Sequence, residues 1–308
     1  MDRLAHRDSD AADIIDAHVH IWADDRSAYP HVDGHERPLT ATGSAEQLLA
    51  SMDECGVAGA LLVQAPWYGE DNRYFAVTRR RHPGRFVALG YLPDPLASDA
   101  PEKLSRQFHD DGCRGVRVHL LDGRIAAGLD TGRADPLIRR AGELGVPVQF
   151  LTREPARHEL IFRLARRFPD VVFINDHLGH PRIGEGDPYP SSRAFFDCGA
   201  RPNVFAKLSL HYLLSGEGYP WADLHDFQQR TVAAYGAQRL LWGSNFPMHL
   251  PTPSYRERLD AVRRELSFLT KNERSWILGQ TARSLWTFTG AGPDESAPEG
   301  VAEEGVLR

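Results

Sequence analysis

Residues 14–22, IIDAHVHIW, are the stretch from which the fold of this chain is best inferred. Its apolar residues are mainly β-branched and suit a buried strand of a parallel sheet. Asp16, His18 and His20 alternate along it, so we expect the three side chains on one face of the strand. Burying three such groups without partners costs on the order of several kcal/mol. We therefore interpret the pattern as functional rather than as core histidines satisfied by hydrogen bonds.

The same alternation of strand and helix continues along the chain. Further strands are predicted at residues 59–64, 86–92, 115–121, 146–151, 171–176, 204–210 and 240–244. Ser44, with Gln47 three residues later, predicts the start of the first helix, and Gly56 predicts its end. Later helices are predicted at residues 72–82, 100–111, 136–144, 157–168, 191–199, 224–235, 255–266 and 273–286.

About eight strand and helix units predict the α/β class and a (β/α)8 TIM barrel with long βα loops and C-terminal helices. A doubly wound sheet is less favoured, because no GxGxxG or GxxxxGK[ST] loop follows a strand. We expect one barrel domain over residues 14–289, an N-terminal extension over residues 1–13 and an acidic flexible tail over residues 290–308. A tail that embraces a neighbouring subunit is the alternative.

Composition narrows the expected partners of the chain. With 308 residues, 42% hydrophobic and 25% charged, it resembles an ordinary globular enzyme. A net charge of −6 without a basic run argues against a nucleic-acid partner. We find no signal peptide and no stretch long and apolar enough to span a membrane, so we expect a cytoplasmic protein with a small-molecule substrate. A homo-oligomer stays open.

The three cysteines, Cys55, Cys113 and Cys198, are odd in number and form no CxxC pair. A disulfide framework or a thiolate zinc site is therefore not expected. We predict that all three lie in the core or in helices.

Polar side chains recur where predicted strands end, and in a barrel these ends meet at one mouth. The candidates are His18, His20, Arg117, His119, His177, Lys207, Tyr212, Asn245 and His249. Arg117 could instead form an ion pair with Asp16 or Asp176, and Lys207 could extend outward to solvent. Their collection at strand ends favours a site.

Two tryptophans lie on the loops after the first and second strands. Trp22 and Trp67 could stack on a flat substrate ring, or they could simply pack the mouth of the barrel. The sequence leaves both readings open.

Five motifs, taken in order and spacing, resemble the amidohydrolase superfamily. They are DAHVHIW, GVRV, INDHLGHP, NVFAKLS and LLWGSNFP, and the match extends from Ile14 to Trp286. Within the superfamily the chain is similar to the amidohydrolase-related group that contains sugar lactonases and pyrone dicarboxylate lactonase. The resemblance implies a (β/α)8 barrel that hydrolyses a C–O or C–N bond, or in related branches breaks a C–C bond by decarboxylation.

Two departures from the family pattern bear on mechanism. Members with a full metal centre carry a histidine at the end of strand five, where this chain has VPVQFLT at residues 146–152. They also carry an aspartate at the end of strand eight that handles the proton of the attacking water, where this chain has Asn245. An amide cannot act as a general base at neutral pH.

We therefore expect a hydrolase that opens a small lactone by attack of water on a polarised carbonyl. His18, His20, His177 and Asn245 are the expected catalytic residues, with the proton passing to His177 or His20 while Asn245 orients the water. The three histidines could also hold one divalent metal, such as zinc, although a metal-free mechanism stays open.

The expected substrate contacts come from a wider set of residues. They are Trp22, Trp67, Arg117, His119, Lys207, Tyr212 and His249, of which Arg117 and Lys207 could pair with an anionic substrate. Substrate identity is expected to reside in the loops over residues 23–43, 121–133, 179–190 and 213–221. The alternatives are a decarboxylase or lyase acting on an aromatic or unsaturated acid, and a non-catalytic binding protein on this scaffold.

Overall fold

The computed structural model describes residues 14–32 and 43–288. The predicted N-terminal extension, the predicted acidic tail and part of the first long loop lie outside the described residues. The strands are β1 (Ile15–Val19), β2 (Gly59–Val63), β3 (Phe86–Tyr91), β4 (Val116–His119), β5 (Val148–Leu151), β6 (Phe173–Asn175), β7 (Val204–Ser209) and β8 (Leu240–Gly243).

Helices follow the strands in the alternating order that the sequence predicts. They are α1 (Ala45–Cys55), α2 (Arg73–Arg81), α3 (Ala100–His109), α4 (Gly123–Asp130), α5 (Asp135–Glu143), α6 (His158–Arg167), α7 (Arg193–Cys198), α8 (His211–Leu214), α9 (His225–Tyr235), α10 (Tyr255–Arg263), α11 (Lys271–Ser275) and α12 (Thr281–Leu285). A π-helical segment, Trp276–Gln280, joins α11 to α12.

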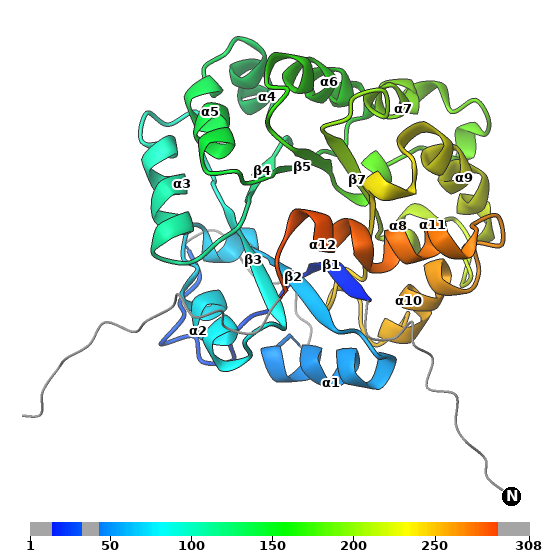
Figure 1. Cartoon of the computed structure of the whole chain (residues 1–308), viewed down its shortest axis with the longest axis horizontal. Coiled ribbons are helices and arrows are strands. Elements are labelled where there is room, and N and C mark those ends of the chain that lie inside the picture. The colour runs from blue at the N-terminus through cyan, green and yellow to red at the C-terminus, as the bar shows by residue number, and fades with distance from the viewer. Residues whose placement is uncertain (1–13, 33–42, 289–308) are drawn as a thin grey trace, which may run out of the picture.

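The eight strands form a nearly closed parallel barrel inside a ring of helices (Figure 1). Each strand pairs with the next along the chain, as expected for a (β/α)8 barrel. The first and last strands meet through two backbone hydrogen bonds, from Asn245 N to His18 O at 2.8 Å and from His20 N to Phe246 O at 2.7 Å. The predicted fold class is confirmed.

The ends of α1 confirm the predicted signals. The Ser44 side chain accepts a hydrogen bond from Gln47 N, and the Gln47 side chain accepts one from Ser44 N. Gly56 follows the helix with φ of 73°, a left-handed conformation that glycine adopts without steric cost.

Two predicted loops contain helix. The segment 121–133 was expected to be irregular, but α4 occupies most of it, with the Asp122 side chain accepting from Arg124 N as an N-cap. Gly123 and the polar residues around this segment obscured its apolar face, which buries Ile125 and Leu129. The short helix α8 likewise extends into the segment 213–221.

A register irregularity in β1 changes which of its residues share a face. Asp16 pairs with Ala60 and Val19 with Leu62, so three steps along β1 match two along β2. Asp16 turns toward the outer helix α10, where its Oδ2 accepts from Tyr255 OH at 2.9 Å. The prediction that Asp16 shares a face with His18 and His20 is wrong, because an extra residue in a strand reverses the alternation beyond it.

Helix α12 closes the end of the barrel from which the strands start. Ala282 and Trp286 pack on an apolar cluster formed by Ile15, Ala17, Leu61, Val63, Val87, Leu89, Ile174 and Leu241. Trp286 Nε1 also donates to Arg114 O, which precedes β4, at 2.9 Å. Figure 1 shows α12 lying across this end of the barrel in front of β1. The predicted site residues therefore belong to the opposite, open end.

Two further expectations concern the cysteines and the membrane. Cys55, Cys113 and Cys198 are free and buried, as predicted. Among the described residues, no helix has the length and apolar character needed to cross a membrane.

Candidate active site

A buried carboxylate organises the floor of the open end. Asp176 follows β6, and its Oδ2 accepts from Arg117 Nε at 3.1 Å, from Arg117 Nη2 at 3.0 Å and from Gln149 Nε2 at 3.0 Å. Lys207 Nζ lies 3.7 Å from the other oxygen and also donates to Gln149. Arg117 thus forms the ion pair with Asp176 that the sequence left open, and Lys207 points into the barrel rather than to solvent.

The charges of this network compensate one another. Burial alone would raise the pKa of Asp176, but the neighbouring His18, Arg117 and Lys207 together lower it well below its usual value. Burial lowers the pKa of Lys207 to about 8, against the opposing effect of Asp176. The carboxylate is ionised at neutral pH, and the cations around it are held by that charge.

Three histidines lie directly above the carboxylate. His18 Nδ1 is 3.3 Å from Asp176 Oδ1 and 3.3 Å from Lys207 Nζ, while its Nε2 lies 3.4 Å from His20 Nε2. The ring of His177 is 4.6 Å from that of His18, and its Nδ1 is 2.8 Å from Ser209 Oγ. The structure therefore brings together His18, His20 and His177 from β1 and β6.

All three imidazoles are neutral at neutral pH. Burial lowers the pKa of His20 to about 3, with a further contribution from the charge of Arg117. Burial is also the main reason why the pKa values of His18 and His177 lie well below the usual value, followed by the charge of Lys207 for His18 and, for His177, by the repulsion that a protonated His18 would exert. Neutral imidazoles can accept a proton or donate a lone pair to a metal.

The arrangement of nitrogens fits a divalent metal. His20 Nδ1 lies 2.7 Å from the carbonyl oxygen of Val63, which only accepts, so Nδ1 carries the proton and Nε2 keeps its lone pair. The 3.4 Å between His18 Nε2 and His20 Nε2 is close to the separation of about 3.3 Å between two tetrahedral zinc ligands at about 2.0 Å from the ion. In a metal-free state, a proton on His18 Nε2 would satisfy the same contact.

A second group of candidate metal ligands shares two residues with the predicted group of His18, His20 and His177. Ligand atoms of His18, Asp176 and His177 lie within 4.8 Å of one another, and the contacts of Asp176 Oδ1 are with His18 Nδ1 at 3.3 Å and Lys207 Nζ at 3.7 Å. His18 and His177 occur in both sets, whereas His20 belongs to the predicted set and Asp176 to this one. Histidine and carboxylate are both ordinary zinc ligands.

Asn245 and Tyr212 contact each other beyond the end of β8. Asn245 follows β8, and its Nδ2 donates to Tyr212 OH at 3.0 Å. The hydroxyl in turn donates to Met248 O at 3.2 Å. Asn245 N also donates to His18 O at 2.8 Å, so the backbone of Asn245 lies beside the strand that carries His18. A role for its side chain at the site stays a prediction.

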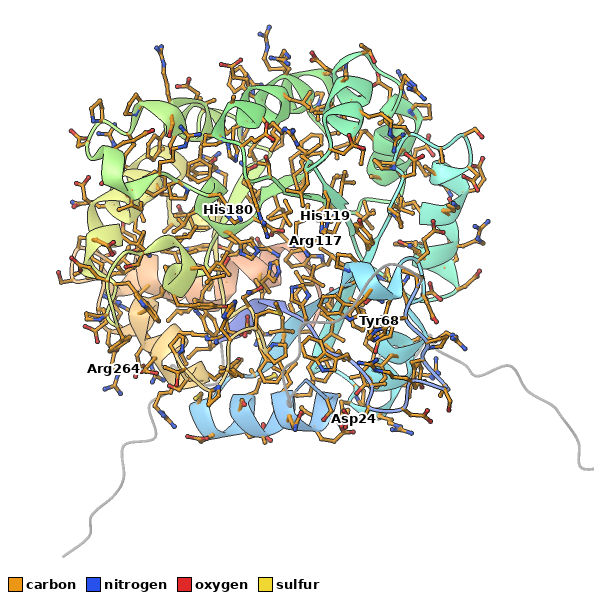
Figure 2. The ribbon with its side chains drawn as sticks, turned by 180° about the vertical axis from the view of Figure 1, so that it is seen from behind. Asp24, Tyr68, Arg117, His119, His180 and Arg264 are labelled. Atoms are coloured by element: carbon orange, nitrogen blue, oxygen red, sulfur yellow. The ribbon has the colours of Figure 1, made fainter. Side chains whose placement is uncertain are left out.

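Two histidines of the open end have buried nitrogens with no hydrogen bond among the described residues. The Nε2 atoms of His119 and His180 are both in this state. The His119 ring is 4.7 Å from Tyr91, and the His180 ring is 5.6 Å from His177. In Figure 2 the labels of Arg117, His119 and His180 lie close together near the centre of the barrel.

The remaining predicted substrate contacts are two tryptophans and a histidine. Trp22 and Trp67 are buried against each other, with ring centroids 5.5 Å apart, so the packing expected of mouth aromatics is present. Whether either also stacks on a substrate stays a prediction. His249 is exposed, with its ring 5.5 Å from Tyr212.

A groove of about 930 Å³ lies outside the barrel between α6 and α7. Its lining includes Glu154, Phe162, Arg182 and Asp197, and none of the residues predicted for the site. Its lining offers no histidine and no buried charge cluster, unlike the open end of the barrel.

A comparison of the sequence with models of protein families gives a match over nearly all of the described residues. The family model described as amidohydrolase matches residues 15–288. The chain belongs to the amidohydrolase family. The strand-end histidines and the barrel around them are thus those of an amidohydrolase.

Relatives with assigned names are similar over most of this amidohydrolase. An L-fucono-1,5-lactonase from Burkholderia ambifaria is 27% identical over 240 residues, covering 76% of this chain and 80% of its own. A 2-pyrone-4,6-dicarboxylate hydrolase from Comamonas testosteroni is 28% identical over 249 residues, covering 77% of each chain. A crystal structure of an amidohydrolase from Burkholderia multivorans with bound zinc shares the fold, with a TM-score of 0.69, 23% identity and coverage of 89% of this chain and 99% of that one.

Sequence reasoning missed one exposed cation at the mouth. Arg153 lies two residues beyond β5 and has no hydrogen bond or ion pair among the described residues. The charge of Arg153 is one of the lesser causes that lower the pKa values of His119 and His180, so Arg153 lies near these two histidines. The signal in the sequence was a charged residue directly after the predicted strand at residues 146–151.

Two further residues of this amidohydrolase were also missed. Gln149 bridges Asp176 and Lys207 from inside the barrel, and Arg258 lies under the β8 loop from the outer helix α10. A glutamine in an apolar strand was a weak signal, and an arginine on an amphipathic helix gave none.

Proposed function

We propose that this amidohydrolase opens a small lactone by attack of water on the ring carbonyl. The observation that carries the proposal is the cluster of three neutral imidazoles, His18, His20 and His177, held over the buried Asp176 at the open end of the barrel. The lactonase and pyrone hydrolase names of the two relatives support the same class of reaction.

The reaction needs a base for water and an acid for the leaving alkoxide. The water oxygen bonds to the carbonyl carbon, the ring C–O bond breaks, and one proton passes from water to an imidazole and then to the alkoxide. In the metal-free form of this proposal His20 and His177 are the acceptors, because a metal bound to the same nitrogens would occupy their lone pairs. His20 offers Nε2, because Val63 holds the proton on Nδ1, and His177 is oriented by Ser209.

A divalent metal, zinc in this proposal, would be held by His18, Asp176 and His177, whose ligand atoms lie within 4.8 Å of one another, and His20 would add its Nε2 from 3.4 Å beyond His18 Nε2. Bound there, it would polarise the carbonyl and lower the pKa of water. The 3.4 Å between His18 Nε2 and His20 Nε2, the close grouping of His18, Asp176 and His177, and the zinc in the Burkholderia multivorans structure support this assignment.

The charges at the mouth bear on the substrate. Arg117 and Lys207, the expected partners of an anionic substrate, are engaged with Asp176. Arg153 is exposed and uncompensated at the mouth, and it can pair with a carboxylate substituent. We propose that a lactone with a negatively charged substituent would contact Arg153.

The proposal is tested with purified protein and a panel of neutral sugar lactones and carboxylated pyrones. A pH indicator should report acid release from at least one lactone, because ring opening produces a carboxylate and a proton. His177→Gln should abolish the release. His109→Gln, which removes an exposed histidine on α3, should leave it unchanged.

Two outcomes would contradict the proposal. Release of carbon dioxide from an aromatic acid, with no acid from any lactone, would favour the decarboxylase alternative. Binding of a lactone without turnover would favour a binding protein on this scaffold.

A further inference from the structure

The hydrogen bonds around Asn245 fix the direction of its amide. Met248 O can only accept, so the Tyr212 hydroxyl, 3.2 Å away, uses its single proton toward Met248. The hydroxyl oxygen must then accept from Asn245, which has to present its amide nitrogen at 3.0 Å. The carbonyl oxygen of the amide, Oδ1, is thereby left on the side that faces away from Tyr212.

The backbone of Asn245 is fixed as well. Its N–H donates to His18 O at 2.8 Å, across the seam between β8 and β1. Its φ of 56° sets the turn that follows β8. The backbone of Asn245 is therefore held beside His18, and the contact with Tyr212 decides which of the two amide atoms points away from Tyr212.

Tyr212 is itself held by a buried arginine. The guanidinium carbon of Arg258 lies 4.3 Å from the centroid of the Tyr212 ring, a cation–π distance. Arg258 is 1% exposed, and it donates to the carbonyls of Ser244, Asn245, Met248 and Pro253. One side chain thus fixes the Tyr212 ring and the loop that supplies Met248 O.

An amide needs such a partner, whereas a carboxylate does not. The two oxygens of a carboxylate are equivalent acceptors, so either can face a water molecule. An amide that turns by 180° presents N–H in place of oxygen, and an N–H cannot accept a proton or a hydrogen bond from water. Asparagine at this position is useful as an acceptor only while its orientation is fixed.

We propose that Tyr212, held by Arg258, is a positioning residue that keeps Asn245 Oδ1 directed at the water that attacks the substrate. This inference rests on the proposed function, since that function supplies the attacking water. With Tyr212 and Arg258 in place, Asn245 accepts a hydrogen bond from the water, and an imidazole takes the proton of that water.

The test is a comparison of Tyr212→Phe in two backgrounds, wild type and Asn245→Asp. In wild type the substitution should lower kcat for the lactone about fivefold to tenfold and leave KM unchanged, because it removes one neutral hydrogen bond that orients the water. In the Asn245→Asp background the same substitution should change kcat less than twofold. Tyr74→Phe, which removes a hydroxyl bonded to Ala45 N, is the matched control and should leave kcat unchanged.

A second measurement does not depend on turnover. The chain contains five asparagines, so selective ¹⁵N-asparagine labelling gives few side-chain amide signals, and Asn245→Asp identifies the one from Asn245. Its amide protons should exchange with solvent slowly in wild type and faster in Tyr212→Phe. Arg258→Lys, which shortens the reach to the carbonyls, should give an intermediate rate.

The outcomes separate the inference from the proposed function. If wild type hydrolyses no lactone but Tyr212→Phe speeds exchange at Asn245, the proposed function fails and the orienting contact stands. If kcat falls equally in both backgrounds and exchange does not change, Tyr212 is merely structural and the inference is overturned. Circular dichroism melting of each variant establishes that it is folded.

Discussion

His158 should make the stability of this amidohydrolase depend on pH. Its ring lies beneath the turn that carries His177 and His180, where a Cβ added to Gly179 would be 2.9 Å from its Nε2. Its Nδ1 lies 2.8 Å from the carbonyl oxygen of Pro155, and its Nε2 is buried with no hydrogen bond among the described residues. A second proton would therefore enter an apolar space beside Phe195.

The change in unfolding free energy with pH can be calculated from the shift in the pKa of His158. Burial lowers the pKa of His158 from 6.5 to about 4. The unfolded chain then binds the extra proton more readily, so this contribution to stability is full above pH 6.5 and is lost as the pH falls toward about 4. At about 1.4 kcal/mol per unit, the full loss is about 3 kcal/mol, and about 2 kcal/mol of it is reached at pH 5.

The measurement is urea unfolding of wild type and His158→Gln at pH 7.5 and pH 5. Glutamine can donate to Pro155 O and does not titrate, so the variant should lose about 2 kcal/mol less than wild type between the two pH values. Equal m-values for the two proteins are required for the comparison. The exposed-histidine variant His109→Gln should behave as wild type, and equal pH dependence in all three proteins would refute the reasoning.

Three further predictions concern the site. Arg117→Met leaves the buried Asp176 with two hydrogen bonds fewer, so unfolding free energy should fall by about 3–5 kcal/mol; a loss below about 1 kcal/mol would show that the ion pair is dispensable. Metal analysis should find about one equivalent of zinc in wild type and far less in His20→Ala. Full activity after exhaustive chelation would remove the metal from the mechanism. Arg153→Gln should raise KM about tenfold for a carboxylated lactone and leave KM for a neutral lactone unchanged. Equal changes for both substrates would contradict a role for Arg153 in binding the carboxylate.

The strand ends were predictable because two local rules act together there. Apolar β-branched runs identify buried strands, and a polar side chain at the end of such a run has few uses other than at the barrel mouth. His18 lies in β1 and His177 follows β6, 159 positions further along the sequence, yet both rules place them at the same end of the barrel. The barrel and the histidine cluster therefore follow from residue type and order.

Partners across the barrel were not predictable in the same way. Arg117 had two candidate carboxylates, Asp16 and Asp176, and alternation alone placed both of them inside. The choice depends on the register of β1, which a single inserted residue changes without any mark in the sequence. The orientation of Asn245 depends likewise on a tyrosine and an arginine that belong to other elements.

Because of the irregularity in β1, the aspartate of the DxHxH pattern has a different role from the two histidines. Asp16 Oδ1 accepts from His18 N at 3.2 Å and from Ser244 N at 2.9 Å, so one carboxylate fastens β1 to β8 directly below the site. Ser244 precedes Asn245, and His18 carries the cluster, so this bond fixes the separation of the two sides that must meet a substrate. Had the strand been regular, Asp16 would point inward and join Asp176, and two buried carboxylates would compete for Arg117 and Lys207. Within the DxHxH pattern, Asp16 therefore links β1 to β8, whereas His18 and His20 are the two expected site residues.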